Sequence, residues 1–187
     1  MVAVRVLALL PLVLLPAAAQ AQTPLADPSG TYLTEDGRAR IRVEFCGPQK
    51  REVCGYVVWL KEQGAQPDKL DSKNPDPART SRPLLGHQLI MGLKRRPENY
   101  EGTIYNSENG KQYNVTIWKD GSDLKVRGCL VAFLCATQTW TPAAGRVPGE
   151  LAGLTGRPDG PRPDPEWASA ETTAPATPAR REARPKS

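Results

Sequence analysis

The residue types in this chain that could carry chemistry are one histidine, four cysteines and the carboxylates. A Ser-His-Asp triad or a histidine-based metal site would have to use His87. No nucleophile elbow surrounds it in Gly86-His87-Gln88, and the chain lacks P-loop and H-E-x-x-H patterns. A lone histidine at the start of a strand is usually structural. We therefore predict no catalytic residue, metal or cofactor, and we favour a protein that is not an enzyme.

The four cysteines have the spacing of two β-hairpins. Cys46 and Cys54 flank the loop GPQKREV, and Cys129 and Cys135 flank LVAFL. Facing residues of two hairpin arms lie within the Cα separation of about 4.5–6 Å that a disulfide accepts. Pairing 46 with 54 and 129 with 135 is the simplest of the three possible connectivities. The rival is a four-cysteine zinc site, whose ligand pairs are usually only about two to four residues apart.

A polar, proline-rich segment, LDSKNPDPARTSRPLLG, occupies Leu70–Gly86. Asp76 before Pro77 predicts a helix N-cap with proline at the first helical position. We expect a single helical turn over Pro77–Ser81, which Pro83 ends. Such a segment is too specific to be a simple flexible linker.

The elements that must position these groups are short β-strands. In RARIRVEF, charged residues alternate with apolar ones, which are Ala39, Ile41, Val43 and Phe45. This is the period of a half-buried strand. Further candidates are CGYVVWL, QLIMGL, YEGTIY, QYNVTIW, LKVRG and ATQTW, several of them bounded by Asp-Gly or Asn-Gly. About eight antiparallel strands predict an all-β fold, a closed up-and-down barrel or failing that a sandwich.

Aromatic side chains are the main resource for binding in such a barrel. Strand parity, which a β-bulge would reverse, predicts inward side chains for Val57, Trp59, Gln138 and Trp140. Inward aromatic rings either pack the core or line a small apolar cavity. The strand aromatics that could do so are Trp59, Tyr105, Tyr113, Trp118 and Trp140.

The charged groups of the insert have two interpretations. They could pair with each other or with the barrel rim, so that the segment staples a crossover across one barrel end. Alternatively, Asp71, Asn74 and Arg82 could contact a ligand at the mouth. Enzymatic use of an inward acid or of Arg127 is a further, less favoured alternative.

Both ends of the chain differ from the middle. Arg5, the apolar run Val6–Ala18 and Ala19-Gln20-Ala21 have the form of a secretory signal with its cleavage site, so we expect residues 1–21 to be removed on export. The barrel domain then spans residues 22–141. Residues 142–187 are rich in proline and alanine with a single Trp167, and they predict a disordered tail.

The segments LDSKNPDPARTSRPLLG, YEGTIYNSENGKQYNVTIW and LKVRGCLVAFLCATQTW closely resemble bacterial domain-of-unknown-function family 2147. The resemblance covers about Gly30 to Thr141 in the family's motif order. It implies an exported, lipocalin-like β-barrel and no particular chemistry. The chain departs from the family's usual residues at Tyr100, Ser107 and Pro142.

We therefore predict a periplasmic or secreted, non-catalytic β-barrel that binds a small hydrophobic or amphipathic ligand. The alternative is an envelope interaction protein with a filled barrel, whose 70–86 insert and tail contact a partner. Basic residues are dispersed despite the net charge of +5, which gives no nucleic-acid groove and at most a weak attraction to anionic surfaces. The candidate ligand-binding residues are Trp59, Asp71, Asn74, Arg82, Tyr105, Tyr113, Arg127 and Trp140.

Overall fold

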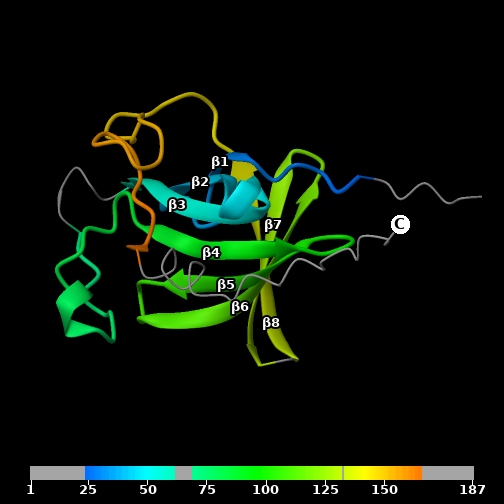
Figure 1. Cartoon of the computed structure of the whole chain (residues 1–187), viewed down its shortest axis with the longest axis horizontal. Helices are drawn as coiled ribbons and strands as arrows, with labels where there is room; N and C mark the ends of the chain where they lie inside the picture. The colour runs from blue at the N-terminus through cyan, green and yellow to red at the C-terminus, as the bar shows by residue number, and fades with distance from the viewer. Residues whose placement is uncertain (1–23, 62–68, 132, 166–187) are drawn as a thin grey trace, which may run out of the picture.

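Figure 1 shows the computed structural model, which describes residues 24–61, 69–131 and 133–165. Within these residues the chain forms a closed antiparallel barrel in which each strand pairs with the next and β8 pairs with β1. The strands are β1 (Gly30–Leu33), β2 (Ala39–Cys46), β3 (Glu52–Leu60), β4 (Gln88–Arg95), β5 (Tyr100–Asn106), β6 (Lys111–Asp120), β7 (Asp123–Val131) and β8 (Leu134–Pro142). The predicted all-β, up-and-down barrel is confirmed.

The two ends of the barrel differ. The β2–β3, β4–β5 and β6–β7 turns lie at one end, which we call the closed end, and its interior is filled by buried apolar side chains that include Val43, Val53, Leu93, Ile117 and Leu124. Gly102 makes this packing possible, because a Cβ there would lie 2.8 Å from Leu93 Cδ2. At the other, open end lie the β1–β2, β5–β6 and β7–β8 turns and the β3–β4 connection.

The predicted alternation in β2 is confirmed, but a β-bulge changes its partner strand. Ile41 is buried in the core, and its neighbours Ala39 and Phe45 pack against that core. Ile41 pairs with Val57 whereas Arg40 pairs with Trp59, so the register shifts by one residue between them. Trp59 therefore lies on the outer face, where the guanidinium carbon of Arg40 is 5.8 Å from the indole centroid. The inward placement of Trp59 was wrong because the bulge reverses parity.

Both predicted disulfides are confirmed. Cys46 and Cys54 are bonded with a Cα separation of 5.8 Å, and they tie the β2–β3 hairpin at the closed end. Cys129 and Cys135 are bonded with a Cα separation of 4.0 Å near the β7–β8 turn at the open end.

Residues 143–165, which we call the C-terminal strap, pack against the barrel. This segment is drawn from yellow to orange in Figure 1 and contains no strand. Arg40 Nη1 donates to Gly145 O at 2.7 Å and to Glu150 Oε2 at 2.8 Å. Arg42 donates to the carbonyl oxygens of Leu151 and Gly153 at 2.7 and 2.6 Å.

The predicted start of the disordered tail at Pro142 is therefore corrected, because the strap is an ordered part of the fold. The prediction rested on the abundance of proline and alanine in this segment, whereas backbone carbonyls that accept hydrogen bonds from arginine side chains of β2 hold the strap. The rest of the predicted tail, with Trp167, and the predicted signal segment 1–21 lie outside the described residues. In the part of the chain that is described, no helix is long and apolar enough to cross a membrane.

Candidate ligand-binding site

The open half of the barrel encloses a cavity of about 640 Å³. Most of its wall is apolar, and the lining side chains include Ile41, Val57, Ile104, Val115, Val126 and Trp140. The polar part of the lining includes His87, Tyr105, Tyr113 and Gln138, and it also contains the charged side chains of Asp36, Arg38, Lys69 and Glu108. The cavity exists because the large side chains of the core lie toward the closed end. In the open half, Gly128 on β7 and Ala136 on β8 have little or no side chain to fill the interior.

Two polar groups of the lining are already paired with protein atoms. Trp140 Nε1 donates to Gln138 Oε1 at 2.8 Å. The hydroxyl of Tyr113 accepts from Asn109 Nδ2 at 2.8 Å. Because their polar atoms have partners, the two aromatic rings offer the cavity mainly apolar surface.

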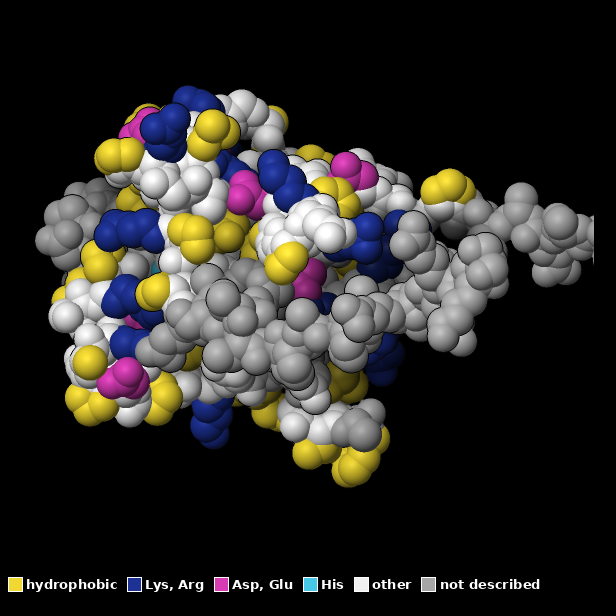
Figure 2. All heavy atoms as spheres, viewed as in Figure 1, with side chains coloured by type: hydrophobic (Ala, Val, Ile, Leu, Met, Phe, Trp, Pro, Cys, Tyr) yellow, Lys and Arg dark blue, Asp and Glu magenta, His cyan; other side chains and the backbone are white. Residues whose placement is uncertain are grey.

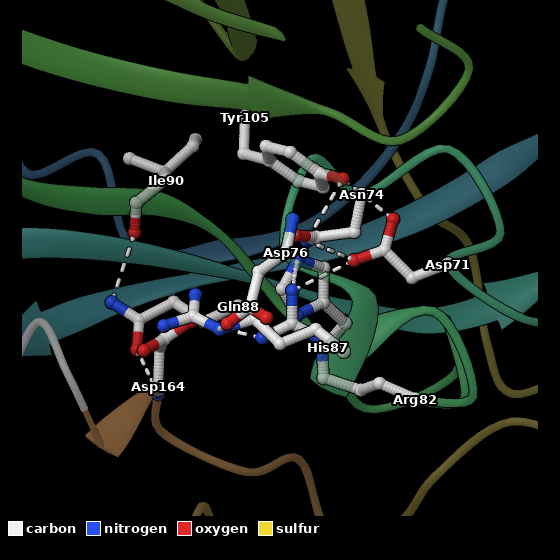
Figure 3. Close-up of polar contacts among 10 residues, drawn as sticks. Asp71, Asn74, Asp76, Arg82, His87, Gln88, Ile90, Tyr105 and Asp164 are labelled. Atoms are coloured by element: carbon white, nitrogen blue, oxygen red, sulfur yellow. Dashed lines mark hydrogen bonds and ion pairs between the residues drawn. The ribbon is translucent and has the colours of Figure 1, made fainter. Parts of the chain in front are cut away.

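The polar insert meets the barrel at Asp71, whose side chain is 0% exposed (Figure 3). Its Oδ1 accepts from the Tyr105 hydroxyl at 2.6 Å. Its Oδ2 accepts from Asn74 Nδ2 and from Arg82 Nη2, both at 2.8 Å. Both oxygens of this buried carboxylate therefore have donors, which is the condition for burying its charge.

The local structure of the insert places these donors. The predicted helical turn is present as a 3-10 turn over Pro77–Arg79, and Asp76 caps it by accepting from Ala78 N at 2.9 Å. Arg82 N then donates to Arg79 O at 2.9 Å, which turns the chain back. Asp71 N donates to Arg82 O at 2.9 Å, so backbone and side chains close the insert on itself.

Arg82 also contacts the C-terminal strap. Its Nη1 donates to Asp164 Oδ2 at 3.0 Å, and the backbone N–H of Asp164 donates to Gln88 Oε1 at 2.8 Å. Asp71, Arg82 and Asp164 thus join the insert, the start of β4 and the strap (Figure 3). We call Asp71, Asn74, Arg82, Tyr105 and Asp164 the insert network.

His87 lies between the insert network and the cavity. Its Nε2 is 3.5 Å from Arg82 Nη2, and its ring meets that of Tyr105 edge-on at 5.5 Å between centroids. Burial, together with the Arg82 charge, lowers the pKa of His87 to about 4. Since a guanidinium can only donate, a hydrogen bond between these two atoms requires a neutral imidazole that accepts at Nε2 and carries its proton on Nδ1. Burial and the neighbouring Asp71 raise the pKa of Tyr105 to about 12, so it remains a neutral donor.

Lowering the pH from 6.5 to 4.5 is expected to reduce the free energy of unfolding through His87. Its pKa is about 4 when folded against an ordinary 6.5, so the unfolded chain binds the proton more readily over this window. The stability from His87 is therefore fully present above pH 6.5 and lost as the pH falls toward 4. The loss between pH 6.5 and 4.5 amounts to about 2 kcal/mol, measurable by urea unfolding.

His87→Gln is the control for this pH dependence, because the chain has a single histidine. The carboxylates titrate alike in both proteins, so the difference between them isolates the imidazole. An identical loss of stability in the variant and the unmodified protein would contradict the assignment.

The structure groups the predicted site residues in three ways. Tyr113 and Trp140 line the cavity, as does Tyr105, which also belongs to the insert network with Asp71, Asn74 and Arg82. Trp59 lies on the outer face. Arg127 is exposed opposite Thr116 and Thr137 on the outside of the barrel.

Sequence reasoning missed two residues of the site. Asp164 lay in the segment predicted to be disordered, and no pattern in the sequence marks it. His87 was interpreted as structural, yet it also lines the cavity. A signal for Arg127 was present, because the parity that sends Val126 inward sends Arg127 outward.

No group of three or more His, Cys, Asp or Glu side chains that could hold a metal ion occurs among the described residues. The cavity wall offers apolar surface, a neutral imidazole and a neutral phenol for binding, and charged side chains also line it.

The chain is similar to one protein family and to a solved structure. Residues 30–142 match the family described as "Uncharacterized protein conserved in bacteria (DUF2147)". No curated protein matches the chain significantly. A solved structure titled "Protein HP1028 from the human pathogen Helicobacter pylori belongs to the lipocalin family" is similar, with a TM-score of 0.54 and 20% identity over 63% of this chain and 84% of that chain. At this identity the likeness shows the fold alone, a lipocalin-like barrel.

Proposed function

Because this chain belongs to the bacterial family DUF2147, whose matched residues form a lipocalin-like barrel, we propose a function for that barrel. It is an exported, non-catalytic module that binds one small apolar or amphipathic ligand in its cavity. The observation that carries the proposal is the cavity of about 640 Å³ in the open half of the barrel. Ligand sites typically measure about 300–1,000 Å³, and small barrels of this kind commonly hold one ligand.

The lining supports a ligand that is apolar with at most a small polar part. Side chains such as Val57, Val126 and Trp140 would contact its apolar part. His87 and Tyr105, both neutral near pH 7, are the polar groups where the cavity meets the insert network. The role of Asp71, Asn74 and Arg82 in this proposal is to hold Tyr105 and His87 in place, since both oxygens of Asp71 accept hydrogen bonds from Tyr105, Asn74 and Arg82.

Export is part of the proposal. The predicted signal segment argues for it, and two disulfides are compatible with an oxidising compartment such as the periplasm. The alternative of an interaction protein with a filled barrel receives less support, because only the closed half of the interior is filled.

Gly128→Leu is expected to weaken binding of a neutral apolar probe, N-phenyl-1-naphthylamine, about tenfold. Gly128 lines the cavity, and a Cβ placed on it meets no atom within 4 Å, so the leucine side chain would enter the cavity without a backbone clash. It would displace about four non-hydrogen atoms of the probe, each worth roughly 0.3 kcal/mol, or about 1.2 kcal/mol in all. Fluorescence titration measures the change in Kd.

Thr137→Leu is the matched control, since Thr137 is exposed on the outside of the neighbouring strand β8. It adds the same side chain without filling the cavity, and its Kd should match that of the unmodified protein. Equal binding by Gly128→Leu, or no probe binding by the unmodified protein, would count against the cavity as a ligand site. Native mass spectrometry of protein purified from its host would then identify any bound molecule.

A further inference from the structure

The β7–β8 turn carries a cluster of exposed apolar side chains, which we call the hairpin tip. Its members are Leu130, Val131, Phe133 and Leu134, with exposed fractions of 63, 50, 90 and 55%. Among the described residues, the other exposed large hydrophobic side chains are only Leu70 and Leu154. The hairpin protrudes from the barrel in Figure 1, and Figure 2 shows hydrophobic side chains gathered at its end.

The hairpin tip is held in a defined shape. The Cys129–Cys135 disulfide closes the hairpin below it, and Val131 pairs with Leu134 beyond that bond.

The hairpin tip is continuous with the mouth of the cavity. Leu130 and Leu134 also line the cavity, whereas Val131 and Phe133 do not. An apolar path therefore leads from the exposed turn along these two leucines into the interior.

Two basic side chains lie at the same end of the barrel. Lys111 is the first residue of β6. Lys73 belongs to the insert and lies against the β5–β6 turn, where its carbonyl oxygen is so near Gly110 that a Cβ on this glycine would overlap it. Both lysines are exposed, and within the described ranges neither takes part in an ion pair. The chain as a whole has a net charge of +5.

We propose that the hairpin tip inserts into the interfacial region of an anionic lipid bilayer and turns the cavity mouth toward it. Exposed aromatic and aliphatic side chains, with two lysines at the same end of the barrel, suit an anionic interface, which attracts the lysines and solvates the apolar side chains.

Vesicle co-sedimentation tests this proposal. The unmodified protein should bind vesicles of phosphatidylglycerol and phosphatidylethanolamine more tightly than vesicles of phosphatidylcholine. The double variant Val131→Ser, Phe133→Ser should bind at least about tenfold more weakly, because it removes two of the four inserting side chains. Neutralising Lys73 or Lys111 as glutamine should weaken binding to anionic vesicles by about fivefold each.

Leu154→Ser provides the matched control, since Leu154 is 74% exposed on the C-terminal strap rather than on the hairpin. It should bind vesicles as the unmodified protein does. Both replaced residues of the double variant lie outside the cavity wall, so its affinity for N-phenyl-1-naphthylamine should not change. Failure of this proposal is thereby separated from failure of the proposed ligand site.

Two results would overturn the proposal. One is equal vesicle binding by the double variant and the unmodified protein. The other is no vesicle binding by the unmodified protein, together with a concentration-dependent dimer in analytical ultracentrifugation that the double variant abolishes. The second result would assign the hairpin tip to contact between copies of this chain.

Discussion

Arg82→Ala is expected to lower the free energy of unfolding by about 4 kcal/mol, measured by urea unfolding at pH 7. Asp71 is fully buried, and Arg82 is its charged partner at 2.8 Å. Removing the guanidinium leaves the Asp71 carboxylate buried with only neutral donors, from Tyr105 and Asn74. Breaking a buried pair by removing one partner typically costs about 3–5 kcal/mol.

Arg82→Lys distinguishes charge from geometry in the same network. The guanidinium reaches Asp71 with Nη2 and Asp164 with Nη1, at 2.8 and 3.0 Å. A lysine keeps the charge but loses this fork, so we expect only partial recovery of stability. Arg96→Ala is the control, because Arg96 and its partner Glu101 are both about half exposed. That exposed pair should contribute at most about 1 kcal/mol.

The outcome also chooses between the two interpretations of the insert. Lost stability in Arg82→Ala would support the insert as a staple that holds the rim of the barrel. Unchanged stability together with weaker binding of the fluorescent probe would contradict it, and would make Arg82 a ligand-binding residue.

Ending the chain after Pro142 is expected to lower the free energy of unfolding by about 4 kcal/mol. This truncation removes the C-terminal strap and the four hydrogen bonds that Arg40 and Arg42 donate to it. Hydrogen bonds to charged groups contribute about 1.5–3 kcal/mol each, and we take roughly 1 kcal/mol because the truncation lets water reach the freed arginines. It also removes Asp164, and with it one of the two acidic partners of Arg82. Thermal or urea unfolding measures the loss.

A chain that ends after Pro165 is the matched control, because it keeps the whole strap and removes only residues beyond it. We expect its stability to equal that of the full chain. If the shorter truncation product also unfolds at the same urea concentration as the full chain, the strap is not a structural part of the barrel.

The insert network and the C-terminal strap are linked by hydrogen bonds and an ion pair. The outer face of β2 carries Arg40 and Arg42, which hold the strap, and the end of the strap delivers Asp164 to Arg82 and Gln88. The insert is in turn fixed over the rim next to His87 and Tyr105. Stability of the strap is therefore expected to affect the polar side of the cavity.

Local features of this protein followed from the order of its residues. Period-two alternation identified β2, and turn dipeptides and β-branched runs identified the other strands of the barrel except β1, for which no candidate segment was named. Hairpin spacing gave both disulfides, and Asp76-Pro77 gave the capped turn at Pro77–Arg79. These predictions succeeded because each depends on residues that are close in sequence, where backbone geometry leaves few alternatives. The resemblance to a known family added the expectation that the barrel is lipocalin-like.

Other features required the folded chain, because they depend on contacts between distant segments. Trp59 faces outward because of a β-bulge between β2 and β3. The amino-acid composition of these strands does not predict where that bulge lies. Arg82 and Asp164 are 82 positions apart, and Arg42 and Gly153 are 111 positions apart. The cavity exists because side chains from eight strands fill one half of the barrel and leave the other half open. The volume that remains depends on the inward side chains of all the strands together, so the sequence of a single strand does not predict it.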